Sequence, residues 1–320
     1  MTEEIEMFKD VLVGIDTRSG GHDAVALARQ LVSDDGRLTL GHVDDAGAPI
    51  FERNLVLGYD AAGHEATTKL LEAERRAAGP DVGLLRVTAA STGEGLHRLT
   101  ETHAADLLVV GSCSRGRLGR AMLGDDTRDS LNGASCAVAV APVGYAGHER
   151  DLSVIGVAYD GKPDSRAALA AARELAGRSG AAIQVCQVVS LPGYAYSPFG
   201  IGWTENIEFT INGAQERLAE LDGVDGRVVY GVVGEELASF SRGVDLLIVG
   251  SRGYGPVRRL VHGSTSNYLL GHARCVLLVL PRTGGGPQAA VASDQAAAAS
   301  DEARSAVDAE VGVPTLGGAR

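Results

Sequence analysis

The stretch GSRGYGPVRRLVHGSTS, residues 250–266, carries glycines, arginines and a hydroxyl run in a spacing suited to holding a phosphate group. Gly250 follows an apolar run, and its lack of a side chain lets a ligand approach the bare backbone. Gly253 permits a turn that a side chain would strain. Arg252 stands between the two glycines and adds positive charge, which favours an anionic ligand.

The hydroxyl run at the end of this stretch predicts the start of a helix. Gly263 comes first, and the residues that follow are Ser264, Thr265 and Ser266. The first N–H groups of a helix lack partners inside the helix, and the helix dipole is positive at that end, so such a start is an anion site. The hydroxyls of Ser264 and Ser266 can donate to phosphate oxygens. A tight turn followed by an ordinary serine N-cap is the structural alternative.

The chain carries the same pattern of segments twice. Apolar strands end in Asp16 and Asp160, alanine-rich helices follow, and CAVAVAP and CVLLVLP close the two copies. Short apolar runs alternate with helical stretches in the order β-α-β-α-β-α-β-α-β, which predicts parallel strands joined by crossover helices. The sequence therefore predicts an α/β fold of two doubly wound parallel-sheet domains in tandem, over residues 1–147 and 148–282. A flexible Gly/Ala-rich tail is expected over residues 283–320.

Ligands of doubly wound sheets bind at the carboxyl ends of the strands, near the point where the strand order reverses. Asp160 ends the first strand of the second copy, and Gly250 ends the fourth, so both are predicted to lie at that edge. The Asp160 carboxylate can accept hydrogen bonds there from a ribose or an amino group.

The corresponding stretch of the first copy, GSCSRGRLGRAMLGDDT at residues 111–127, departs from this pattern. Ser114 stands where the second copy has Gly253, and Asp125 stands where it has Ser264. An aspartate caps helix N–H groups well and repels phosphate, by about 1–2 kcal/mol after screening. We therefore expect the first copy to bind no nucleotide, or only weakly. Such a weak second site would use Asp16, Val43, Gly111, Gly124 and Thr127.

The arrangement G-x2-G-x9-G-[ST], together with the aspartate after the first strand, resembles the nucleotide loop of the universal stress protein family. The resemblance covers both copies. It implies the family's adenine nucleotide alpha hydrolase-like fold with strand order 3-2-1-4-5, and it implies ATP binding, with or without Mg, in the second copy. By the same resemblance, Asp160 meets the ribose or adenine side, Val188 contacts adenine, and residues 250–266 hold the phosphates.

The resemblance also implies pairing through the fifth strands, as a pseudo-dimer within the chain and as a homodimer of chains. The function that it implies is a stress-response or signalling module with little or no catalysis, at most weak ATP hydrolysis. AMP and a cyclic nucleotide stay open as ligands beside ATP.

Two other functions are left open by the residues. SGGHDA, at residues 19–24, is similar to the SGGxDS loop of ATP pyrophosphatases, but Ala24 takes the place of the last serine. Asp16, Thr17 and Arg18 also separate this segment from its strand. The second alternative is an interaction scaffold that binds no nucleotide, because exposed sheet edges pair with partners. The chain has no GxxxxGK[ST] phosphate loop and no GxSxG nucleophile elbow.

The composition limits the partners. A net charge of −12 and a pI of about 5.1 argue against nucleic acid and anionic membrane surfaces. No apolar run approaches the ~20 residues of a membrane helix, and the N-terminus lacks a signal pattern, so a cytoplasmic location is expected. The four cysteines show no CxxC spacing and the histidines no HExxH, so no metal site is predicted.

Overall fold

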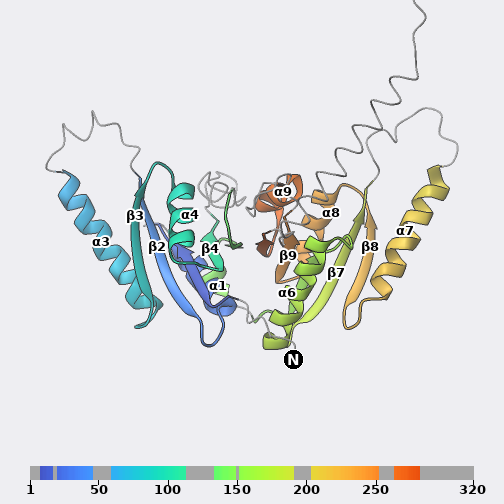
Figure 1. Ribbon diagram of the computed structural model, residues 1–320, viewed down its shortest axis with the longest axis horizontal. Helices are drawn as coiled ribbons and strands as arrows, with labels where there is room; N and C mark the ends of the chain where they lie inside the picture. The colour runs from blue at the N-terminus through green and yellow to red at the C-terminus, as the bar shows by residue number, and fades with distance from the viewer. Residues whose placement is uncertain are drawn as a thin grey trace, which may run out of the picture. The chain divides into compact units, whose positions relative to one another are not determined.

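The computed structural model describes residues 8–16, 20–45, 59–112, 133–148, 151–190, 203–251 and 263–281. Strands and helices alternate along both halves of the chain (Figure 1). The fourth helix predicted for the first copy and the Gly/Ala-rich tail lie outside these residues. In the described part, no helix combines the length and the apolar character needed to cross a membrane.

The first half follows the predicted alternation as far as it is described. Its elements are β1 (Asp10–Gly14), α1 (Gly20–Leu31), β2 (Arg37–Asp45), α3 (Tyr59–Ala78), β3 (Gly83–Ala89), α4 (Thr92–Thr102), β4 (Leu107–Gly111), β5 (Ala137–Ala141) and the short 3-10 helix η1 (Tyr145–His148).

The second half contains every element that the sequence predicts for it. These are β6 (Val154–Ala158), α6 (Pro163–Ser179), β7 (Ala182–Val189), α7 (Trp203–Ala219), β8 (Asp225–Tyr230), α8 (Val233–Phe240) with the 3-10 turn η3 (Ser241–Gly243), β9 (Leu246–Gly250), α9 (Ser264–His272) and β10 (Val276–Leu280).

The described strands form one sheet in the order β3-β2-β1-β4-β5-β10-β9-β6-β7-β8. The predicted order 3-2-1-4-5 is thus confirmed in both halves, and the pairs within each half are parallel. One antiparallel pair joins the halves, with Leu278 of β10 opposite Ala139 of β5. The fifth strands therefore pair within the chain, and association of two chains stays a prediction.

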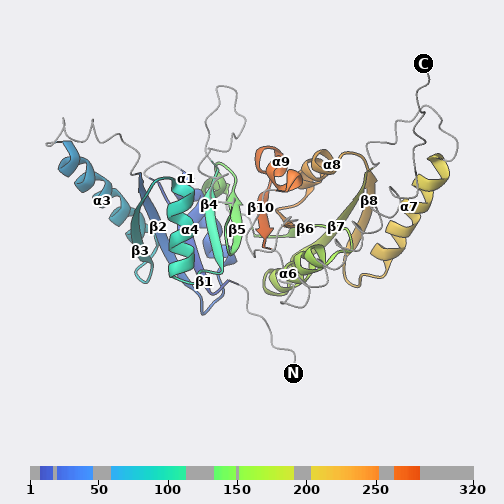
Figure 2. The ribbon, with the colours of Figure 1, turned by 45° about the horizontal axis from the view of Figure 1, so that its top comes forward.

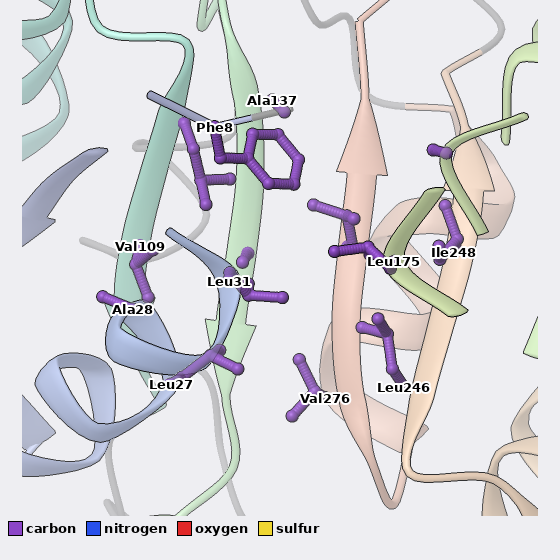
Figure 3. Close-up of a cluster of buried hydrophobic side chains, with 14 of the residues drawn as sticks. Phe8, Leu27, Ala28, Leu31, Val109, Ala137, Leu175, Leu246, Ile248 and Val276 are labelled. Atoms are coloured by element: carbon purple, nitrogen blue, oxygen red, sulfur yellow. The ribbon is translucent and has the colours of Figure 1, made fainter. Parts of the chain in front are cut away.

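Helices cover both faces of the sheet, because successive strand residues point to opposite sides. In β4, Leu107 and Val109 belong to a buried cluster with residues of α1, α3, α6 and α7 (Figure 3). Leu108 and Val110 belong to a second cluster, with residues of α4, α8 and α9. Figure 2 shows α4 in front of the strands of the first half. Burial on both faces explains why the strands read as continuous apolar runs.

An aspartate before the fourth strand of each half ties two strands together. Asp106 Oδ2 accepts hydrogen bonds from the backbone N–H groups of Lys9, at 2.7 Å, and Asp10, at 3.2 Å. Asp245 Oδ2 accepts from the N–H groups of Ser153 and Val154, both at 2.9 Å. Each carboxylate thus binds donors at the start of the neighbouring central strand. This contact gives a structural reason for the aspartate that leads both DLLVVG and DLLIVG.

The repeated arginine of the first helix of each copy also has a structural role. Arg29 donates to the backbone carbonyls of Ala77 and Ala78, where α3 ends, at 3.0 and 2.8 Å. Arg173 donates at 3.0 Å to the Asp222 carbonyl, just after α7. A cation near a helix C-terminus pairs with carbonyl groups that have no partner inside the helix.

Replacing Asp106 by Asn should leave the free energy of unfolding unchanged or raise it, whereas replacing it by Ala should lower it by about 1–3 kcal/mol. Asn keeps an oxygen for the two backbone donors, and Ala leaves both unpaired. Burial raises the pKa of Asp106 in the folded chain, and its Oδ1 has no partner among the described residues. Folding therefore favours the protonated form of Asp106. The contribution of this protonation to the free energy of unfolding is present at low pH and is lost as the pH rises through the raised pKa.

Urea unfolding measures both substitutions. The advantage of Asp106→Asn over the natural chain should be largest at neutral pH and should shrink as pH falls toward the ordinary aspartate pKa, near ~4. Equal losses from the Asn and Ala substitutions at pH 7 would contradict this account.

Candidate nucleotide-binding site

The carboxyl ends of β6 and β9 lie side by side in the second half. The two strands pair in parallel, with Val157 opposite Ile248. Asp160 follows β6 by two residues, and Gly250 is the last residue of β9. The structure thus places these two predicted site residues at the same edge of the sheet, where the strand order reverses.

Gly250 is required by the packing of the helix after β6. A Cβ atom at this position would lie 2.7 Å from the backbone oxygen of Asp164, in the first turn of α6. No side chain fits so close to a backbone atom. The sequence predicted that this glycine lets a ligand approach the backbone, and the structure adds that it lets α6 pack on the end of β9.

The N-terminus of α9 offers backbone donors. Gly263 is the N-cap, with φ −68° and ψ 142°, and no side chain of the described residues caps the helix. The first helical hydrogen bond runs from the Asn267 N–H to the Gly263 carbonyl, at 3.0 Å. By contrast, the Ser91 side chain caps α4 by accepting from the Glu94 N–H at 3.2 Å. The expected alternative, a serine N-cap at the start of α9, is therefore not what the structure shows.

The charge around this helix start also differs from that of its neighbours. The first turn of α6 carries Asp164, and the first turn of α8 carries Glu235 and Glu236. The first turn of α9 has no acidic residue. Because acidic side chains offset the positive end of a helix dipole, α9 keeps a free positive end where α6 and α8 do not.

The hydroxyls of α9 have different surroundings. Ser264 is exposed and Thr265 is half-buried. Ser266 is buried, and its Oγ donates to the Gly263 carbonyl at 3.1 Å. The Ser266 hydroxyl therefore helps to hold the helix start in place, and Ser264 is the better placed of the two to meet a ligand.

Asp160 is held by a residue that the sequence interpretation did not include. Its Oδ1 accepts from the Lys162 backbone N–H at 3.1 Å, and its Oδ2 lies 3.3 Å from Lys162 Nζ. The Asp160 N–H lies 3.3 Å from Ser165 Oγ, which can accept from it. The repeat could have pointed to Lys162, because both copies carry a basic residue two positions after the aspartate: Arg18 after Asp16 and Lys162 after Asp160.

Two buried polar atoms near the ends of second-half strands also escaped the sequence interpretation. Ser251 Oγ and Gln187 Oε1 have no hydrogen-bond partner in the part of the chain that the structure describes. Their counterparts in the first half are paired: Ser112 Oγ donates to the Ala141 carbonyl at 2.9 Å, and His42 Nδ1 lies 3.0 Å from the Ile15 carbonyl. Buried polar atoms without partners are uncommon, and a bound polar group is one explanation for them.

The other predicted residues fall into two groups. Val188 is half-buried near the end of β7, and Val43 holds the same place in β2, where a Cβ at Gly95 would come within 2.5 Å of it. Asp16 and Gly111 lie at the corresponding ends of the first-half strands. Outside the described residues lie Arg252, Gly253, Gly124 and Thr127, with Ser114 and Asp125.

The aspartate of SGGHDA has a structural role. Asp23 is buried, and its two carboxylate oxygens accept from the backbone N–H groups of Gly144 and Ala146, both at 2.8 Å. It therefore binds the segment that follows β5. A carboxylate engaged in this way is not available for pyrophosphate chemistry, which weakens the pyrophosphatase interpretation.

The buried thiols offer no nucleophile. Burial, assisted by the nearby Asp106 charge, raises the pKa of Cys136 to about 12. Burial likewise raises the pKa of Cys275 to about 12 and raises that of Cys186. At neutral pH these thiols stay protonated, and the thiolate is the reactive form.

Comparison with known sequences decides the family. The sequence profile described as universal stress protein family matches residues 7–142 and again residues 152–281. The chain belongs to the universal stress protein family. A universal stress protein of Mycobacterium tuberculosis is 30% identical over 191 residues, which are 56% of this chain. The match spans 62% of that relative's length.

Other family members match over more of the chain. A universal stress protein of Mycolicibacterium smegmatis is 29% identical over 298 residues, or 85% of this chain and 97% of its own. The crystal structure of a universal stress protein from Archaeoglobus fulgidus superposes with a TM-score of 0.59 at 15% identity, covering 85% of this chain and 98% of that one. At that identity the structural likeness concerns the fold.

Replacing Gly250 by Ala should lower the free energy of unfolding by about 1–3 kcal/mol, because the new methyl group would overlap the Asp164 backbone. Gly271 is the matched control, since it lies in α9 and a Cβ there meets nothing within 4 Å. Gly271→Ala should be neutral or stabilise the chain by up to ~1 kcal/mol, as alanine favours helix. Thermal or urea unfolding compares them, and similar effects of the two changes would show that Gly250 is not sterically required.

Proposed function

We propose that the chain binds one adenine nucleotide, ATP in the first place, in its second half, and that it works as a nucleotide-responsive stress or signalling module. The observation that carries this proposal is the N-terminus of α9. Its N-cap is a glycine without a capping side chain, and its first turn has no acidic residue. Such a start presents N–H groups and positive dipole charge to an anion.

The residues around this start suit the remaining parts of a nucleotide. Asp160, at the neighbouring strand end, offers a carboxylate to the ribose or adenine side. Val188 offers an apolar contact for the base. Gly250, Arg252 and Gly253 would line the phosphates with Gly263 and the hydroxyls of α9, and Mg can accompany the phosphates of ATP.

In this proposal the first half binds nucleotide weakly or not at all. Its loop carries Ser114 in place of the second glycine and Asp125 in place of the first hydroxyl. Ser112 and His42, which match Ser251 and Gln187, already have partners. A weak site there would use Asp16, Val43 and Gly111 with Gly124 and Thr127. We expect little or no turnover of the bound nucleotide.

Calorimetric titration with ATP tests the proposal. One chain should bind one ATP, and Asp160→Ala combined with Ser264→Asp should abolish the binding. The added aspartate, in the first turn of α9, would offset the positive end of the helix and repel phosphate by about 1–2 kcal/mol. An unaltered chain that binds no adenine nucleotide would favour the scaffold alternative.

Restoring the first loop tests the division between the halves. Ser114→Gly with Asp125→Ser should raise the stoichiometry from one toward two and tighten the first site by roughly 5- to 30-fold, the equivalent of ~1–2 kcal/mol. Two sites of similar affinity in the natural chain would show that the proposed division is wrong.

A further inference from the structure

Lys162 lies at the sheet edge that carries Asp160. It is the N-cap of α6, and its side chain is 66% exposed. Its Nζ lies 3.3 Å from Asp160 Oδ2, while its backbone N–H holds Asp160 Oδ1. The first turn of the same helix packs against Gly250, the first glycine of the loop. The ammonium group thus stands at the edge to which the loop belongs.

Lysines are rare in this chain. The sequence has three lysines and a net charge of −12. Lys9 precedes β1 and lies 3.4 Å from Asp35, and Lys69 lies on α3, 2.6 Å from Glu65. Lys162 is therefore the lysine that lies at the carboxyl end of the second-half strands.

The Asp160–Lys162 contact affects how a ligand can form hydrogen bonds with the Asp160 carboxylate. A ribose hydroxyl that donates to this carboxylate competes with the ammonium for its oxygens. A nucleoside alone offers the ammonium no anion in exchange. A nucleotide offers a phosphate, and hydrogen bonds from a cation to a phosphate are short and strong. The Lys162 side chain is 66% exposed, so moving its ammonium from one anion to another costs little.

We propose that Lys162 exchanges partners when a nucleotide binds: its ammonium leaves Asp160 Oδ2 for a phosphate oxygen, and Oδ2 can then accept from the ribose. This inference rests on the proposed function, because it concerns the same site. It makes Lys162 the residue that couples recognition of phosphate to recognition of ribose. The chain would then select nucleotides over nucleosides through one side chain that is outside the glycine loop.

The test compares three ligands and two substitutions. Calorimetry measures the dissociation constants of ATP, AMP and adenosine for the natural chain, for Lys162→Met and for Lys162→Arg. Lys162→Met should weaken ATP and AMP by about 10-fold, the loss expected for one charged hydrogen bond. It should leave the affinity for adenosine unchanged or raise it, because the ammonium no longer competes for Asp160 Oδ2. Lys162→Arg should keep the preference for nucleotides.

Lys69→Met is the matched control, since Lys69 also forms an exposed ion pair, with a side chain 74% exposed. It should change none of the dissociation constants. Thermal unfolding should show that both Met variants fold as stably as the natural chain.

The outcomes separate the two proposals. If the natural chain binds ATP and Lys162→Met changes its affinity by less than about twofold, or weakens ATP and adenosine equally, the partner exchange is wrong and the proposed function stands. If the natural chain binds no adenine nucleotide, both fail.

Discussion

The strand order places β6 beside β9, and the rest of the candidate site depends on that pairing. The chain leaves β6 toward β7 on one side and later adds β9 on the other. The carboxyl ends of two strands that are distant in sequence thereby meet, with helices leaving in opposite directions. Asp160, the first turn of α6 and Gly250 come together through this arrangement, and the backbone of Asp164 leaves no room for a side chain at Gly250.

Much of this could be predicted from the sequence, because the signals were local and repeated. Buried parallel strands appear as continuous apolar runs, so alternation with helices indicated the sheet, and the duplication indicated that it occurs twice. The order 3-2-1-4-5 came from the family resemblance, and the sheet confirms it. Asp160 and Gly250 lie at strand ends as predicted.

The features that escaped prediction depend on contacts between distant segments. Nothing in the letters DLLVVG shows that Asp106 will accept from the N–H of Lys9. The same holds for Asp23, which accepts from backbone groups more than 100 positions away. Ser266 as a phosphate donor stays a prediction; what the sequence could not indicate is that its hydroxyl donates to the Gly263 carbonyl. A residue type indicates which hydrogen bonds are possible, and packing decides which are made.

The two halves share one architecture and differ in the polar atoms at the ends of their strands. The strand-joining aspartates and the arginines at the helix ends occur in both copies, because they make the same structural contacts in each half. The polar atoms at the strand ends differ: those of the first half are paired, whereas Ser251 and Gln187 lack partners among the described residues. Selection for stability acts on both halves, and ligand binding need be retained in only one.

The central claim is that the second half alone holds an adenine nucleotide. The most direct measurement is to denature the purified protein and to identify and count the nucleotides that are released. About one adenine nucleotide per chain is expected when the protein is purified with ATP present, and none from the variant that combines Asp160→Ala with Ser264→Asp, treated in the same way. An equal release from that double variant, or a release near two per natural chain, would contradict the account.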